Sequence, residues 1–260
     1  MPEFVSLEVR DGVAVVRLDR PPVNAIDRVV GVELLDAFRE AERREDVGAL
    51  VIWGGPKIFA AGADIKAMAE LNAEQIRPVV SALGDALDLL EQMPKISIAA
   101  VEGYALGGGF ELALAADLRY LAKSASVGQP EVTIGVIPGA GGTQRITHLS
   151  GAGVARDLVY TGRIVGAAEA KELLLCNRVV GSGSVFEAAL ADAGGFAKGP
   201  RAALSAAKAA IHAAAGTPGP AGLAAERELF CSLFGTHDQR EGMRAFLEKR
   251  EPHFGPDLKP

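Results

Sequence analysis

The sequence has few cysteines and no excess of positive charge. Its two cysteines, Cys176 and Cys231, are far apart, and neither has the CxxC or Cys/His spacing of a zinc site or a disulfide framework. We therefore expect reduced cysteines and no metal. The chain carries 27 Lys and Arg against 33 Asp and Glu, a net charge of −6. Because nucleic-acid-binding domains are usually basic, this balance argues against a nucleic-acid partner.

Long apolar runs and a targeting pattern are also missing. One of the longest apolar runs, Ile98 to Val101, is far shorter than the ~20 residues that cross a membrane. The first residues include Glu3, Glu8 and Asp11 and lack the pattern of a signal peptide. We therefore expect no membrane partner and a cytoplasmic location. The 260 residues are 49% hydrophobic, which is typical of a globular protein with one large domain, or one domain and an appendage.

Hydrophobic patterning predicts an α/β chain, because predicted strands and helices alternate as they do in crossover connections. The expected order is strands over 5–9 and 13–17 with a turn at Asp11-Gly12, a helix over 29–43, a strand over 49–53, a helix over 73–92, a strand over 96–101, a buried helix over 107–116, a strand over 118–122, helices over 152–160 and 167–173, and a strand over 177–180.

The chain changes character after Gly183. Residues 185–250 are predicted to be helical, with interruptions at glycine- and proline-containing points. We place a domain boundary near residue 195, which separates a core of residues 1–195 from a helical region of residues 196–260.

Common active-site motifs are absent. The sequence contains no GxxxxGK[ST], no GxGxxG after a strand, no HExxH and no GxSxG. The four histidines lie in helical, polar contexts, and we expect them at the surface. Three glycine-containing clusters remain as candidates for a site, over residues 57–66, 103–111 and 128–142.

The second cluster places three glycines, Gly107 to Gly109, before an apolar helix. A helix start exposes free N–H groups and a partial positive charge, which can hold a developing anion. Glu111 lies in the first turn. It is either an ordinary carboxylate that the helix dipole favours, or a buried group with a raised pKa that suits acid–base catalysis.

The other two clusters also allow two interpretations each. Glu131 is either a solvated loop carboxylate or a partner of Glu111, because the intervening helix, strand and turn leave room to bring the two together. In the 57–66 cluster, Gly62 would let a ligand approach the backbone closely, but the segment also fits a surface loop that enters a short helix.

Taken together, the segments 20–26, 59–66, 103–117, 128–145, 160–163 and 236–250 resemble the enoyl-CoA hydratase/isomerase family, the crotonase superfamily. The resemblance covers nearly the whole chain. It implies a spiral of repeated ββα units with a C-terminal helical region that builds homotrimers, commonly stacked as hexamers (dimers of trimers). It also implies an acyl-CoA thioester substrate, so coenzyme A enters with the substrate and neither a metal nor a separate cofactor is expected.

The resemblance assigns the chemistry to a few positions. The two family carboxylates fall on Glu111 and Glu131, and their joint presence favours hydration of a 2,3-trans-enoyl-CoA to the 3-hydroxyacyl-CoA. The backbone N–H groups of Ala63 and Gly108 would form the oxyanion hole. Glu111 would activate the water, Glu131 would protonate carbon 2, and Gly139 would orient the water through its N–H.

The resemblance also implies where coenzyme A binds. Its adenine would lie against backbone groups, and lysines would contact its phosphates, one of them on the ligand of a neighbouring subunit. The backbone positions are Ala25, Ala61, Asp64 and Ile65, and the lysines are Lys57, Lys66 and Lys249 in that order along the chain.

Alternatives remain open at this stage. An enoyl-CoA isomerase needs only one carboxylate, and a non-catalytic member would bind acyl-CoA or RNA. The negative net charge argues against RNA binding, and the presence of both glutamates argues against a member that binds acyl-CoA without catalysis. Phe110 replaces a residue that is small in many hydratases and either narrows the acyl pocket or fills the core. Leu174 stands at a position where relatives often have a glycine that ends a helix. Residues 66–90 carry no motif and are expected to shape the acyl pocket.

Overall fold

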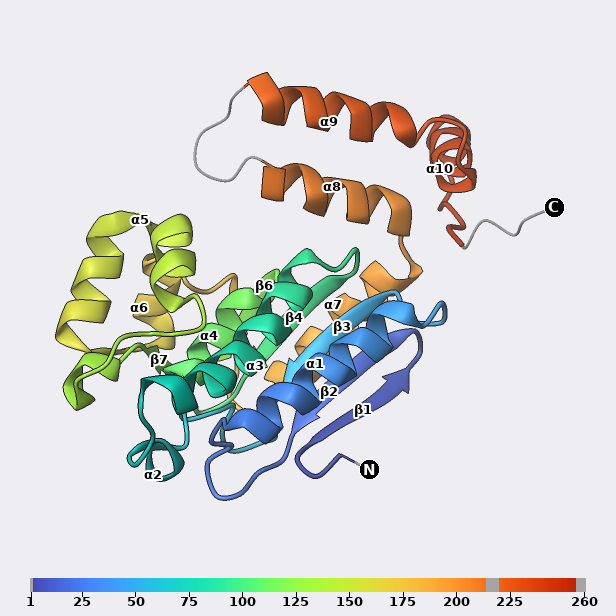
Figure 1. Ribbon diagram of the computed structural model, residues 1–260. Coiled ribbons are helices and arrows are strands. Elements are labelled where there is room, and N and C mark those ends of the chain that lie inside the picture. The colour runs from blue at the N-terminus through green and yellow to red at the C-terminus, as the bar shows by residue number, and fades with distance from the viewer. Residues whose placement is uncertain (1, 214–219, 256–260) are drawn as a thin grey trace.

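The computed structural model describes residues 2–213 and 220–255. A six-stranded sheet forms its centre, with the strand order β1-β2-β3-β4-β6-β9 (Figure 1). Only the β1–β2 pair is antiparallel, and all other neighbours run parallel. The strands are β1 (Val5–Arg10), β2 (Val13–Leu18), β3 (Ala49–Trp53), β4 (Ile96–Val101), β6 (Leu118–Ala122) and β9 (Arg178–Val180).

The hairpin between β1 and β2 confirms the predicted turn. Asp11 (φ 48°) and Gly12 (φ 82°) both have positive φ, the conformation of the tight turns that match the twist of a hairpin. The next strands are buried because helices cover both faces of the sheet: α1 (Arg28–Arg43) and α3 (Ala73–Gln92) pack together on one face, and α7 (Val185–Lys198) packs on the other (Figure 1). Parallel strands of this kind form near-continuous apolar runs.

A small second sheet was not predicted from the sequence. It consists of β5 (Tyr104–Leu106), β7 (Ser126–Gly128) and β8 (Ile164–Gly166) in that order. Each strand has three residues, too few for a period to be recognised. The pairing of β5 with β7 is functionally important, because it brings the ends of two of the glycine-containing clusters side by side.

The remaining helices of the core surround this second sheet. They are α2 (Ile65–Met68), α4 (Gly108–Ala115), the 3₁₀ helix η1 (Glu131–Ile134), α5 (Gly142–Thr161) and α6 (Ala167–Glu172). The helix predicted over 152–160 is the second half of α5, which departs from helical geometry at Gly151 (φ 82°). The strand predicted over 177–180 begins one residue later.

The C-terminal helices form an arm beside the core, made of α8 (Arg201–Ala213), α9 (Pro220–Ser232) and α10 (His237–Glu248) (Figure 1). The boundary placed near residue 195 lies within α7, and the arm begins after Gly199-Pro200. The division into residues 1–195 and 196–260 as domains stays a prediction. Lys208 joins the arm to the core, because its Nζ donates to Oδ2 of Asp117 at 2.9 Å.

Both cysteines are free, with Cys176 buried and Cys231 exposed. All four histidines are exposed, as predicted. Among residues 2–213 and 220–255, no helix combines the length and the apolar character needed to span a bilayer.

Leu174 has a left-handed backbone at the end of α6, with φ 63°. Leu175 N–H donates to the Ala170 carbonyl across it, which is the hydrogen bond of a helix end that favours glycine. The Leu174 side chain is 66% exposed, so it contributes little burial.

We expect Leu174→Gly to raise the free energy of unfolding by about 1 kcal/mol, because the left-handed conformation is strained for leucine and not for glycine. Urea unfolding curves of the two proteins test this. Leu173→Gly, one residue before and within normal helix-end geometry, serves as the control and should destabilise. A Leu174→Gly variant less stable than the wild type would contradict the prediction.

Candidate active site

Glu111 lies inside the protein, at the start of α4. This helix begins at Gly108, directly after β5, and all its residues are buried. Glu111 is 3% exposed, and its Oε1 accepts hydrogen bonds from the backbone N–H groups of Ala140 (2.7 Å) and Gly142 (2.8 Å). It is therefore a buried, hydrogen-bonded carboxyl and not the exposed carboxylate that many helices carry in their first turn.

Glu131 lies on the other side of the same helix start. It is half-buried and opens η1, the short helix after β7. A Cβ placed on Gly107 would be 3.0 Å from Oε1 of Glu131, and a Cβ placed on Gly108 would be 4.0 Å from Oε2 of Glu111. The two carboxyl groups thus flank the first residues of α4. The structure brings together the two glutamates that the sequence singled out.

Gln129 holds the Glu131 carboxyl, and sequence analysis gave it no role. Its side chain is fully buried, with 0% exposure. In the amide orientation that satisfies both groups, its nitrogen donates to Oε1 of Glu131 at 2.7 Å and to Oε2 at 3.1 Å. Its place two residues before Glu131, within the 128–142 cluster, was the signal that could have found it, and a buried amide needs such a partner.

Both carboxyls have a raised pKa, but different neighbouring groups act on each of them. Burial raises the pKa of Glu111, while the N–H groups of Gly142 and Ala140 and the charge of Arg145 act in the opposite direction. Burial, together with the negative charge of Glu111, raises the pKa of Glu131 to about 7. The N–H partners and the positive charge of Arg145 support the charged form of Glu111, whereas Glu131 has a negative neighbour, so a proton held by the pair is favoured on Glu131.

The backbone around Ala63 leaves one N–H group available. Ala63 pairs with Ile26 in a parallel bridge, in which Ile26 N–H donates to the Gly62 carbonyl (2.8 Å) and Asp64 N–H donates to the Ile26 carbonyl (3.0 Å). This pairing leaves the Ala63 N–H without a hydrogen-bond partner in the part of the chain that the structure describes. The group is free to bind a ligand oxygen.

The N–H of Gly108 is available for a different reason. Gly108 is the first residue of α4, and the first amides of a helix have no partner within it. The loop of Ala63 lies against this helix start, because a Cβ placed on Gly107 would be 3.7 Å from Cα of Gly62. Two free donors therefore stand beside the two carboxyls, an arrangement that can stabilise a developing oxyanion.

Gly139 lies in the loop before α5 and is exposed. Its neighbours Ala140 and Gly142, and not Gly139 itself, bind Glu111. A Cβ placed on Gly139 would lie 3.3 Å from Cγ1 of Val80, so Gly139 stands where this loop meets α3. Its role in orienting water stays a prediction.

The loop expected to hold adenine is tied together by Arg20. One guanidinium nitrogen donates to Oδ2 of Asp64 and the other to the Ala25 carbonyl, both at 2.8 Å. This contact with Arg20 lowers the pKa of Asp64, whose other oxygen caps α2. Ala61 N–H donates to the Val23 carbonyl at 3.0 Å. A ligand in this loop would therefore have to use the backbone atoms that these bonds leave free.

The predicted phosphate-binding lysines lie in two places. Lys57 and Lys66 are both exposed, and Ile65 beside Lys66 is 55% exposed. Lys249 is the residue after α10 and caps its C-terminal end. Helices α10 and α2 lie at opposite ends of the molecule (Figure 1). A single chain therefore does not bring Lys249 to the other candidates.

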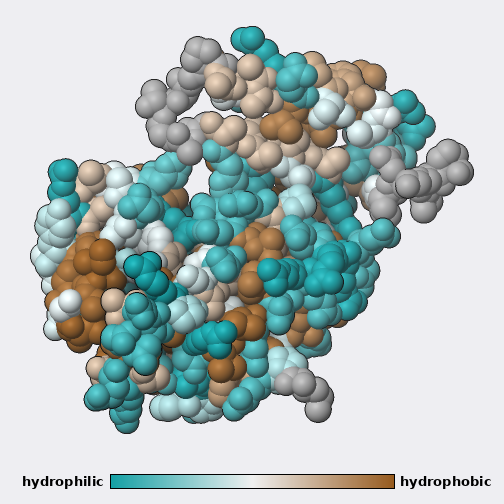
Figure 2. Space-filling model, in the orientation of Figure 1, coloured by the Kyte–Doolittle hydropathy of each residue, from teal (hydrophilic) through white to brown (hydrophobic). Residues whose placement is uncertain are grey.

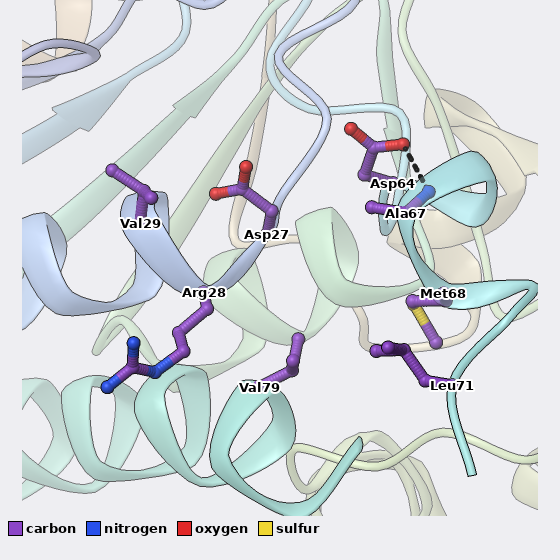
Figure 3. Close-up of a pocket in the computed structure, with 8 residues that line it drawn as sticks. All are labelled: Asp27, Arg28, Val29, Asp64, Ala67, Met68, Leu71 and Val79. Atoms are coloured by element: carbon purple, nitrogen blue, oxygen red, sulfur yellow. Dashed lines mark hydrogen bonds between the residues drawn. The ribbon is translucent and has the colours of Figure 1, made fainter. Parts of the chain in front are cut away.

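A cavity of about 210 Å³ opens next to the candidate site, between the starts of α1 and α2 and the first half of α3 (Figure 3). Asp27 and Asp64, which follow the paired residues Ile26 and Ala63, stand at its edge, and mainly apolar side chains form its walls. The lining residues are Asp27, Arg28, Val29, Asp64, Ala67, Met68, Leu71 and Val79. Four of them fall within the 66–90 segment.

Phe110 does not line this cavity. It is fully buried and belongs to the hydrophobic core, which decides between the two interpretations of this residue in favour of core packing. Within the ranges that the structure describes, no group of three or more His, Cys, Asp and Glu side chains could hold a metal ion.

Comparisons with known proteins agree with this geometry. Residues 8–257 match the family model described as enoyl-CoA hydratase/isomerase. A probable enoyl-CoA hydratase of Mycobacterium leprae is 44% identical over 93% of this chain and 94% of its own length. The mitochondrial enoyl-CoA hydratase of Pongo abelii is 39% identical over 97% of this chain and 88% of its own.

Solved structures lead to the same family. The crystal structure of an enoyl-CoA hydratase from Bacillus anthracis superposes with a TM-score of 0.92, at 38% identity over 97% of this chain and 99% of that one. The predicted resemblance and the predicted fold class are thereby confirmed. The chain belongs to the enoyl-CoA hydratase/isomerase family.

Proposed function

We propose that this protein is an enoyl-CoA hydratase, a hydro-lyase that adds water reversibly and syn to a 2,3-trans-enoyl-CoA and forms the 3-hydroxyacyl-CoA. One observation carries the proposal: two carboxyls with different environments flank a helix start where backbone N–H groups are free. Hydration needs these parts, because a proton leaves water, another reaches carbon 2, and negative charge develops on the thioester oxygen between the two transfers.

The amides of Ala63 and Gly108 are proposed to hold the thioester oxygen as it becomes an enolate. A donor of this kind contributes about 3–4 kcal/mol to transition-state stabilisation. Glu111, whose ionised form its two N–H partners favour, takes a proton from water that Gly139 helps to orient. Glu131, which holds a proton up to about pH 7, supplies it to carbon 2.

Coenzyme A is proposed to lie along the paired loops that Arg20 ties together, with adenine near Ala25, Ala61, Asp64 and Ile65. Lys57 and Lys66 are exposed beside these loops and would meet the phosphates. The acyl tail would extend toward the cavity between α1, α2 and α3. Proton transfer and charge stabilisation come from protein groups, so the proposal includes no metal or redox cofactor. A cytoplasmic location stays a prediction.

A panel of trans-2-enoyl-CoA thioesters of short, medium, long and branched chains tests the function. We expect loss of the conjugated enoyl absorbance and formation of the 3-hydroxyacyl-CoA. Absence of turnover across the whole panel by the folded protein would overturn the proposal. Parallel assays with a 3-enoyl-CoA would reveal the isomerase that needs only one carboxylate, in which case one of the two glutamates would be dispensable.

The C-terminal arm carries an apolar surface that one chain leaves uncovered. Residues 221–232 of α9 include no buried side chain, and Phe246 and Leu247 of α10 are 83% and 79% exposed. A second apolar patch lies over η1 and the start of α5, where Ile134, Val136 and Ile137 are exposed (Figure 2). Apolar surfaces of this kind mark interaction sites.

The family resemblance of the C-terminal segment implies a homotrimer, or a hexamer built as a dimer of trimers, in which Lys249 of one subunit reaches the ligand of another, and the uncovered apolar surfaces support this expectation. Sedimentation equilibrium measures this state. Phe246→Asp should shift the distribution toward monomers, because it places a charge in the surface to be buried. Arg240→Gln, which changes a charge at an exposed position of the same helix, is the matched control. A wild-type protein that stays monomeric at micromolar concentration would contradict the expectation.

A further inference from the structure

Arg145 connects the loop that holds Glu111 to helix α3. Its side chain is 10% exposed, and Nη1 donates to the Ala140 carbonyl at 2.7 Å. Nε and Nη2 donate to Oε2 of Glu91 at 3.0 and 2.6 Å, and Nη2 also contacts Asp88 at 3.3 Å. Ala140 is thus bound from two sides, since its N–H donates to Glu111 and its carbonyl accepts from Arg145.

The loop is shaped around this guanidinium. A Cβ placed on Gly141 would lie 2.2 Å from Nη1 of Arg145, so only glycine leaves room for the contact. Gly141 also has a φ of 105°, a conformation that other residues rarely adopt. Gly141 therefore leaves space for the Arg145 side chain and also allows the turn.

Helix stability alone does not explain a cation here. Arg145 lies in the first turn of α5, where the helix dipole disfavours positive charge. Burying the group adds a desolvation cost, which is offset only by close partners. Those partners are the Ala140 carbonyl and the carboxylate of Glu91, so the position is explained by what Arg145 binds.

We propose that Arg145, anchored by Glu91, is a positioning residue for Glu111, because it fixes the loop whose amides bind the carboxyl and places a positive charge beside it. The inference rests on the proposed hydration. The groups that face Glu111 are Arg145 from α5 and Glu131 from η1, and Glu91 and Asp88 of α3 act on it through Arg145. The charge of Arg145 lowers the pKa of Glu111 against the effect of burial.

The test is the pH profile of kcat/KM for a trans-2-enoyl-CoA, in which the acidic limb reports protonation of Glu111. Arg145→Gln should move this limb to higher pH, because the carboxylate loses a neighbouring positive charge. It should also lower kcat by about 10²-fold with little change in KM, since a displaced catalytic group costs rate more than binding.

Glu91→Gln should shift the limb in the opposite direction. It removes a negative charge that partly neutralises Arg145, so Glu111 becomes easier to ionise and the acidic limb moves to lower pH. Arg145→Lys keeps the charge but cannot bind Ala140 and Glu91 together in the same fork geometry. It should keep the wild-type limb and recover only part of kcat. General damage to the fold would not produce shifts of opposite sign.

Arg156→Gln is the matched control, because it removes one arginine from an exposed position on the same helix and should behave like the wild type. Shifts of the same sign in Arg145→Gln and Glu91→Gln, or wild-type kcat in Arg145→Gln, would overturn the inference. If Arg145→Gln does not fold, Glu91→Gln decides, and an unchanged acidic limb in that variant overturns it. The wild-type protein must hydrate the substrate in every case, so failure of the proposed function is recognised separately.

Discussion

Replacing Glu111 with glutamine is expected to lower kcat for hydration by about 10²–10⁴-fold, the usual contribution of a positioned proton transfer. The glutamine carbonyl can still accept from Ala140 and Gly142, so the loop and the fold should survive the change. What is lost is the group that takes a proton from water. Initial rates with crotonyl-CoA, together with calorimetric titration of the product thioester, separate turnover from binding.

Glu172→Gln is the control for the Glu111 variant, because it makes the same chemical change at an exposed helical position. We expect it to keep wild-type rates. Coenzyme A thioester binding should stay largely intact in both proteins. Near-normal turnover in Glu111→Gln would show that another group activates the water.

Glu131→Gln is expected to lower kcat over the same range, because an amide cannot give the proton that carbon 2 needs. The wild-type protein should also lose kcat/KM as the pH rises through about 7, where Glu131 gives up its proton. The activity falls as the pH rises because the two carboxyls are active when they share one proton and inactive when both are ionised.

The alkaline limb should be the same for hydration and for dehydration, because the ratio of the two kcat/KM values is the equilibrium constant, which does not depend on pH for this reaction. Rates in both directions across the pH range measure it. In Glu131→Gln the residual activity should lack this limb. A limb that stays near pH 7 in that variant would assign the titration to another group.

The two carboxyls illustrate how the same side chain acquires two states. Glu111 is more deeply buried, yet two N–H groups and Arg145 support its charge. Glu131 has the negative charge of Glu111 beside it, and its partners are its own backbone N–H and the side-chain amide of Gln129. Burial acts on both, and the neighbouring groups decide which one keeps its proton.

The sequence predicted the order of the main strands and helices, because the apolar runs of β3 and β4 and the amphipathic patterns of α1 and α3 are local signals. It also determined the family, since several motifs recur in one order along the chain. Glu111, Glu131 and the glycines before α4 were recognisable for this reason. Leu174 was singled out because relatives often have a helix-ending glycine at this position, and its backbone is left-handed.

How these groups meet depends on contacts that form when the chain folds. The strands of the second sheet are three residues long and leave no periodic pattern, yet the pairing of β5 with β7 sets Glu131 beside the start of α4. Arg145 acts through its contact with Glu91, which lies 54 residues earlier in the chain. A local pattern cannot encode such contacts, because they depend on which surfaces pack together once the chain has folded.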